Sequence, residues 1–81
     1  MRIIGEIPHP DCKISIFYMN QKYILKFERG NFEQSFKISE FDFLIKSIED
    51  IKTIVDIIFI EKVNKRFQEM NAQFNEALKD Y

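Results

Sequence analysis

The sequence predicts an α+β fold, in which a four-stranded antiparallel meander is followed by a short helix and a long C-terminal amphipathic helix packed on one sheet face. Apolar and polar side chains alternate through residues 1–38, and a period of two is typical of half-buried strands. Through residues 47–81 apolar side chains recur mostly at gaps of three and four, which is the spacing of one helix face. Residues 39–46 form the crossover between the two patterns. The 81 residues are short enough to make a single domain.

Four segments carry the strand pattern, and their apolar positions agree when neighbouring segments are paired as hairpins. A slip of one residue moves the whole apolar set of a strand to the other face, so this agreement defines the register. The side chains predicted on the inner face are Ile3, Gly5, Ile7, Cys12, Ile14, Ile16, Tyr18, Tyr23, Leu25, Phe27, Phe32, Phe36 and Ile38.

Turn residues separate these segments. Pro8 and Pro10 donate no ladder hydrogen bond, so residues 8–11 are predicted to form the first loop. Asn20 tolerates the positive φ of a tight hairpin turn between the second and third segments. Gly30 stands first in the next turn, as a type II′ turn prefers.

These turns predict which residues face one another across the sheet. Opposite charges then pair on one face and apolar side chains pair on the other, as stable cross-strand pairing requires. Glu28 and Glu33 make one like-charge pair, which Lys13 and Lys26 only partly offset. The other predicted pairs are Glu6 with Lys13, Lys13 with Glu28, Ile16 with Leu25, and Leu25 with Phe36.

The helical half is predicted to begin at Ser47, because Ser-x-x-Asp is a helix-start signal. Residues 39–46 before it fit either a helical turn or an extended crossover. Asp56 either caps a second helix or lies within a continuous one. From residue 57 to residue 81 no Gly or Pro interrupts the chain. The apolar stripe of this segment is Ile60, Val63, Phe67, Met70, Phe74, Ala77 and Tyr81.

That stripe has two compatible interpretations. In the first it lies across the apolar face of the meander and completes the core. In the second its far half extends past the sheet and pairs with a twin helix, because the segment from residue 57 to residue 80 is about 36 Å long and a short sheet is narrower. The candidate dimer contacts are Met70, Phe74, Ala77 and Tyr81.

Composition narrows the classes of protein. With 46% hydrophobic residues the chain is too apolar to be disordered, and a net charge of -1 argues against a strongly electrostatic partner. A single Cys excludes an internal disulfide and fits a reducing compartment. The chain start has no apolar signal-peptide core, and no run approaches the roughly 18 apolar residues of a membrane span. We therefore expect a cytoplasmic protein with no membrane span.

Few residues suggest chemistry. His9, Asp11 and Cys12 lie close together, but structural zinc takes four ligands and the chain has no second Cys or His. A Cys12–His9 nucleophilic pair has no third group to orient it. The sequence therefore predicts no metal, no other cofactor and no enzymatic activity.

The outer face of the predicted sheet is a second candidate surface. Ile4, Phe17, Met19 and Ile24 gather toward one end of it, and a contiguous apolar group usually marks a contact surface. Alternatively, the crossover around residues 41–45 folds back over this face. We expect a non-enzymatic, homodimeric interaction module that also contacts another, unidentified protein.

A single-stranded nucleic-acid-binding protein is the alternative function. Four lysines of the outer face would contact phosphates, and Phe17 would stack on a base. The net charge and the acidic residues of the same face argue against this function. The four lysines are Lys13, Lys22, Lys26 and Lys37.

Two resemblances accompany these expectations. Ile-Gly-Glu-Ile-Pro-His-Pro at residues 4–10, Lys-Tyr-Ile-Leu-Lys-Phe-Glu-Arg-Gly at residues 22–30 and Phe-Glu-Gln-Ser-Phe-Lys at residues 32–37 resemble a family of small uncharacterised proteins from Bacteroidota. The likeness covers most of the chain, and that family has no assigned activity. In architecture alone, four antiparallel strands followed by a helix resemble PUR repeats and Whirly-type domains, which dimerise and bind single-stranded nucleic acid on their sheets. This second likeness assigns no residue a role, because fold alone does not confer function.

Overall fold

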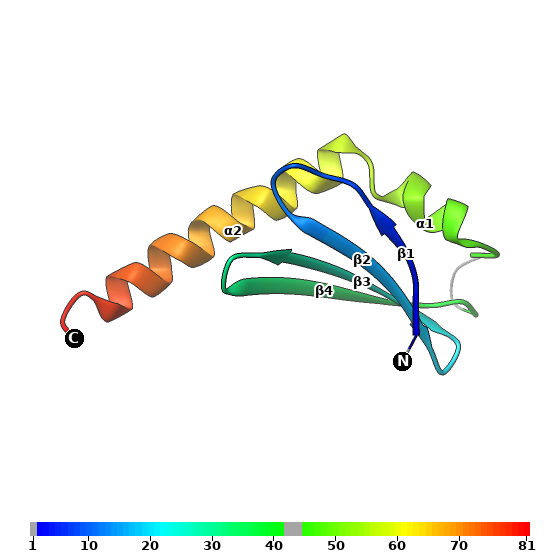
Figure 1. Cartoon of the computed structure of the whole chain (residues 1–81), viewed down its shortest axis with the longest axis horizontal. Helices are drawn as coiled ribbons and strands as arrows, with labels where there is room; N and C mark the ends of the chain where they lie inside the picture. The colour runs from blue at the N-terminus through cyan, green and yellow to red at the C-terminus, as the bar shows by residue number, and fades with distance from the viewer. Residues whose placement is uncertain (1, 42–44) are drawn as a thin grey trace.

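The structure is a computed structural model, and it describes residues 2–41 and 45–81. In these residues the chain forms the strands β1 (Arg2–Ile7), β2 (Lys13–Met19), β3 (Lys22–Arg29) and β4 (Phe32–Ser39), followed by the helices α1 (Ile48–Ile54) and α2 (Ile57–Leu78). The strands are antiparallel in the order β1-β2-β3-β4, and both helices lie on one face of the sheet (Figure 1). The predicted fold class is confirmed.

The register of the three strands β2, β3 and β4 agrees with the sequence prediction. Leu25 in β3 faces Ile16 on one side and Phe36 on the other, and Glu28 faces both Lys13 and Glu33. The turns between these strands have the expected backbone. Asn20 and Gln21 have φ angles of 52° and 62°, and Gly30 has a φ of 59°. Tight turns with positive φ keep the right-handed twist of the flanking strands, so they set the register on both sides.

The register of β1 differs from the prediction. Glu6 faces Ser15 instead of Lys13, and a β-bulge lies between Ile3 and Gly5. The extra residue of a bulge reverses the alternation of side chains beyond it. Ile3 consequently faces Phe17 on the outer side and is 50% exposed, whereas Ile4 packs against the core.

Gly5 in β1 brings the backbone of the sheet close to α1. A Cβ built at Gly5 would collide with Cδ1 of Ile48, the first residue of α1. The absence of a side chain therefore lets α1 lie directly on this edge strand (Figure 1).

The core lies between the inner face of the sheet and the two helices. A hydrogen bond also joins the sheet to α2, because Nε2 of Gln34 in β4 donates to the carbonyl oxygen of Val63 at 2.9 Å. Phe36 of β4 meets Phe59 of α2 edge-on, with ring centroids 5.2 Å apart. The most deeply buried large side chains are Phe27, Phe67, Ile14, Ile16, Leu25, Ile51 and Val63.

Asp56 begins a second helix, which settles one of the alternatives that the sequence left open. Its carboxylate accepts a hydrogen bond of 2.9 Å from the backbone N–H of Phe59. Ser47 takes the extended backbone of an N-cap, but its side chain makes no capping bond. Instead, Asp50 Oδ2 accepts a hydrogen bond of 2.8 Å from the N–H of Lys46, the residue before this N-cap.

The crossover is described only in part. Residues 42–44 lie outside the described residues, so the choice between a helical turn and an extended crossover stays open there. Ile45 is buried in the core cluster, and Phe41 is mostly exposed. None of the helices described is long and apolar enough to cross a membrane.

Candidate protein-interaction site

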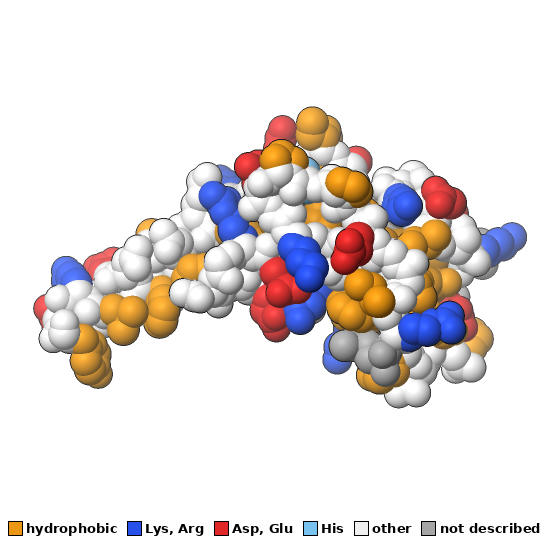
Figure 2. Space-filling view, in the orientation of Figure 1, with side chains coloured by type: hydrophobic (Ala, Val, Ile, Leu, Met, Phe, Trp, Pro, Cys, Tyr) orange, Lys and Arg blue, Asp and Glu red, His pale blue; other side chains and the backbone are white. Residues whose placement is uncertain are grey.

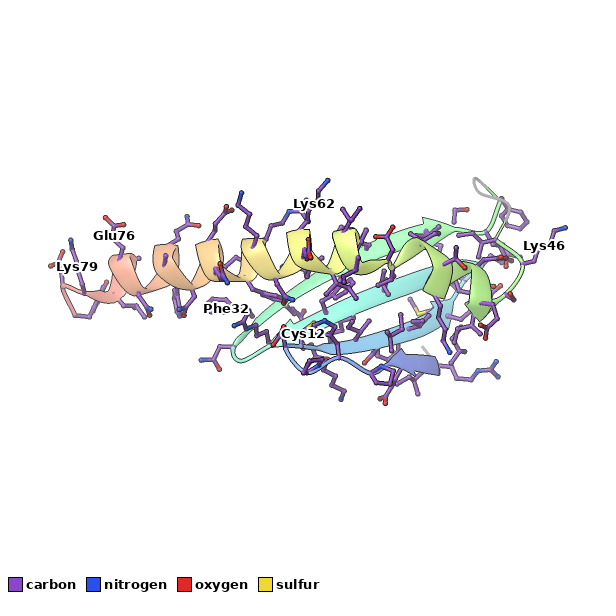
Figure 3. The ribbon with its side chains drawn as sticks, turned by 90° about the horizontal axis from the view of Figure 1, so that it is seen from above. Cys12, Phe32, Lys46, Lys62, Glu76 and Lys79 are labelled. Atoms are coloured by element: carbon purple, nitrogen blue, oxygen red, sulfur yellow. The ribbon has the colours of Figure 1, made fainter. Side chains whose placement is uncertain are left out.

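The free end of α2 is the most prominent surface feature of the molecule. The helix has 22 residues and continues well past the edge of the sheet, so that the molecule is 48 Å long but only 25 and 20 Å across (Figures 1 and 3). We call residues 68–81 the α2 tail. The tail continues the same gaps of three and four that place Val63 and Phe67 on the core side of the helix.

The side chains of this stripe change from buried to exposed within two helical turns. Phe67 is 2% exposed, Met70 is partly buried, and Phe74 is 47% exposed. Ala77 and Tyr81, farther along, are also exposed, and Leu78 joins them on the same side. Figure 2 shows hydrophobic side chains gathered along the lower border of the tail. The last contact of the stripe with the sheet is made by Phe74, and beyond it the stripe has no cover from the described residues of this chain.

Phe32 marks the last contact between the sheet and α2 (Figure 3). Its ring meets that of Phe74 edge-on at a centroid distance of 5.8 Å. A shallow groove beside this pair is lined by Phe32, Met70, Gln73, Phe74 and Ala77. The four residues predicted as dimer contacts thus fall on one exposed surface, three of them in or beside this groove.

The outer sheet face carries the second predicted surface, with one correction. Phe17 and Ile24 face each other across β2 and β3, and Met19 lies at the end of β2. The placement of Ile4 on this face was wrong, because the bulge turns Ile4 toward the core and puts Ile3 beside Phe17. Glycine inside a strand pattern is a known sign of a bulge, so Gly5 was the signal that could have revealed this.

Ile24 is less exposed to solvent than its position on the outer sheet face suggests. It is 9% exposed and does not belong to the core cluster. Its cross-strand neighbours Phe17 and Lys37 flank it on the outer face. Of the crossover residues 41–45, which the alternative placed over this face, Ile45 is buried in the core cluster and Phe41 is mostly exposed. Residues 42–44 lie outside the described residues, so that alternative stays open for them. Ile3 and Met19 are the more accessible apolar side chains here.

The lysines predicted to contact nucleic acid do not form an uninterrupted basic track. Lys26 Nζ lies 3.3 Å from Glu33 Oε2 and 3.9 Å from Glu28 Oε1, so two carboxylates compensate its charge. Lys13 faces Glu28 directly across β2 and β3. Lys22 and Lys37 stand nearer the opposite end of the face, beside its apolar side chains.

A third apolar group was not singled out by the sequence. Ile54, Ile57 and Ile58 are exposed where α1 meets α2. The signal was present, because three isoleucines within residues 57–60 are more than one helix face can bury. Of these three isoleucines, only Ile60 is buried in the core.

The titratable groups of the first loop make local contacts. His9 Nδ1 accepts a hydrogen bond of 3.1 Å from the backbone N–H of Asp11. Burial, followed by the neighbouring Asp11 carboxylate, raises the pKa of the Cys12 thiol, and Arg29 lowers it by less. A raised pKa keeps the thiol protonated, which disfavours it as a nucleophile. Among the described residues, no group of three or more potential metal ligands comes together.

Comparisons of the chain with protein-family models, with curated proteins and with solved structures find no match. The resemblance to a Bacteroidota family and the architectural likeness to PUR and Whirly-type domains therefore stay predictions.

Proposed function

We propose that this protein is a non-enzymatic interaction module that acts as a homodimer, with the α2 tail as the dimer contact. The observation that carries the proposal is the apolar stripe on the tail, which the protein's own sheet covers at Met70 and on one side of Phe74 but no farther. A second copy would bury Phe74, Leu78 and Tyr81 without any change in the fold.

Helix stability supports the same proposal. Most of the stability of helices in proteins comes from packing of their apolar face, with a smaller contribution from helix propensity. In the α2 tail, Met70 packs against the core and Phe74 meets Phe32, and the stripe beyond them gains no such packing from the described residues. Burial against a twin supplies the missing stabilisation, at about 25 cal/mol for each Å² of apolar surface.

A further protein partner is assigned to the outer sheet face. Ile3, Phe17 and Met19 lie together there, on the opposite side of the sheet from the helices. The dimer contact therefore leaves this face open to another protein. We assign the protein to the cytoplasm, because a chain with one cysteine forms no internal disulfide and suits a reducing compartment.

Light scattering across a concentration series tests the proposal, with Phe74→Glu as the variant. The substitution places a charge in the contact opposite the same charge of the twin, so dissociation is expected with the domain still folded. Ala72→Glu is the matched control, since it adds the same charge to the same tail at an exposed position off the stripe. Retention of the monomeric mass by the unsubstituted protein at high concentration would overturn the homodimer.

A further inference from the structure

The charges of α2 are arranged against its own dipole. Residues 57–67 carry three basic side chains and one acidic one, whereas residues 68–81 carry three acidic side chains and one basic one. A helix is stabilised by acidic groups near its N-terminus and basic groups near its C-terminus, which is the reverse order. The first turn of α2 contains no acidic residue and the last turn no basic one. Asp56 at the N-cap and Lys79 at the C-cap interact favourably with the dipole, whereas the charges between these caps follow the unfavourable order.

The same order is favourable between two helices that run in opposite directions. An antiparallel pair of tails brings the acidic end of each helix beside Lys65 and Arg66 of the other, and the two macrodipoles oppose and offset one another. Within the described residues, the ion pairs lie on the sheet, at Lys26, and none involves α2. The charges of the helix therefore have no described partner in their own chain.

From this we infer that the two copies pair through antiparallel α2 tails, with Arg66 of each copy facing Asp80 of the other. The inference rests on the proposed homodimer and specifies its geometry. Arg66 and Gln73 are spaced by seven residues within α2, so they lie on one side of the apolar stripe. Asp80 comes seven residues after Gln73, just past the last helical residue Leu78, and it continues on the same side because the C-cap Lys79 keeps an αR backbone. A two-fold axis that passes near Gln73 has Arg66 on one side and Asp80 on the other. Each of these two residues is then about 10 Å from the axis along the helix.

The apolar stripe fits the same axis. Phe74 then meets Phe74 of the second copy, and Met70 comes opposite Ala77. The groove lined by Phe32, Met70, Gln73, Phe74 and Ala77 lies on the Gln73 side of the stripe, which is the side that the second helix approaches.

A parallel pair makes no such contacts. In a parallel pair each flank of the stripe faces the opposite flank of the other helix. The flank opposite Arg66 and Asp80 carries the uncharged side chains of Asn64, Asn71 and Leu78. The acidic ends would then gather at one end of the pair, where like charges repel.

Charge reversal distinguishes these arrangements in the full-length protein. Arg66→Asp and Asp80→Arg each create two like-charge contacts in the antiparallel dimer, so each is expected to raise the dimer dissociation constant about tenfold at low salt. The double variant restores opposite charges and is expected to return to within about threefold of the unsubstituted protein. Lys65→Asp is the matched control, because it reverses an exposed charge on α2 away from this flank.

Cysteine cross-linking supplies a second measurement. A mixture of Arg66→Cys and Asp80→Cys proteins should form a mixed disulfide on mild oxidation, and Arg66→Cys alone should not cross-link to itself. The unsubstituted protein is the control, because its Cys12 is buried.

The outcomes separate the inference from the proposed function. A dimer that forms, ignores both single charge reversals and cross-links Arg66→Cys to itself would overturn the antiparallel arrangement and leave the homodimer standing. A monomeric unsubstituted protein would overturn both. Weakening by each single variant together with recovery in the double variant supports the inference.

Discussion

The ring of Phe32 stands edge-on to the ring of Phe74, at 86° and with centroids 5.8 Å apart. Phe32 is the first residue of β4 and Phe74 lies nearly five turns into α2, so this pair joins the end of the sheet to the free tail. Edge-to-face aromatic pairs add about 0.5–1.5 kcal/mol beyond the area that they bury. The pair thus orients the tail, and the stripe beyond it remains for a partner.

Leu25→Ala tests the register of the central strand. Leu25 is 1% exposed between Ile16 and Phe36, so we expect the substitution to lower the free energy of unfolding by about 2–5 kcal/mol. Ile24→Ala should cost less, about 1–2 kcal/mol, because Ile24 lies outside the core cluster on the other face. Urea denaturation of both variants is the measurement, and a larger loss for Ile24→Ala would contradict the assignment of faces.

Gly5→Ala tests the close approach of α1 to the sheet. The added Cβ would collide with Ile48 Cδ1, so we expect a loss of about 1–3 kcal/mol in unfolding free energy. Ile48→Val removes that Cδ1 atom. In this background Gly5→Ala should be neutral or slightly stabilising, because Ala is better than Gly within a strand. Equal losses in both backgrounds, measured by a thermodynamic cycle, would show that the collision does not limit this position.

Asp56→Ala tests the break between α1 and α2. The substitution removes the acceptor for the Phe59 N–H, so the free energy of unfolding should fall by about 0.5–2 kcal/mol. Asp56→Asn keeps an acceptor at the same position and serves as the control, with an expected loss of a few tenths of a kcal/mol. Equal thermal destabilisation by the two variants would argue for a charge effect in place of the cap.

The raised pKa of the Cys12 thiol predicts that the free energy of unfolding falls at alkaline pH. Burial and the Asp11 carboxylate raise the pKa of its thiol above the ordinary value of 9.0 in the folded protein. The unfolded chain therefore releases this proton first, and the free energy of unfolding falls as the pH rises from the unfolded pKa through the folded one.

Denaturation curves between pH 8 and pH 10 check this prediction with Cys12→Ala as the comparison. The variant should show a flatter dependence of the unfolding free energy on pH. Tyr18 contributes at still higher pH, because its hydrogen bond to Glu40 raises the pKa of the phenol above 10.0. Parallel curves for the two proteins below pH 10 would exclude Cys12 as the source.

The central part of the fold could be predicted because local signals there agree with one another. The two tight turns at Asn20 and Gly30 allow few pairings, and the alternation of side chains selects one of them. The start of α2 at Asp56 was predicted only as an alternative. The hydrogen bond to Phe59 decides it, since a carboxylate can cap a helix or lie on its surface with the same sequence around it.

By itself the sequence determined the fold class, the register of β2 to β4 and the stripe of α2. These follow from periods of two and 3.6 residues and from turn chemistry, which act over a few residues. The bulge in β1 was decided by tertiary structure, because a loop without a tight turn leaves the edge strand free to shift and Gly5 lets α1 pack on it. Tertiary structure also decided where the apolar stripe of α2 becomes exposed. Periodicity marks an apolar face, but only the position of Phe32 at the end of the sheet determines where the cover of that face stops.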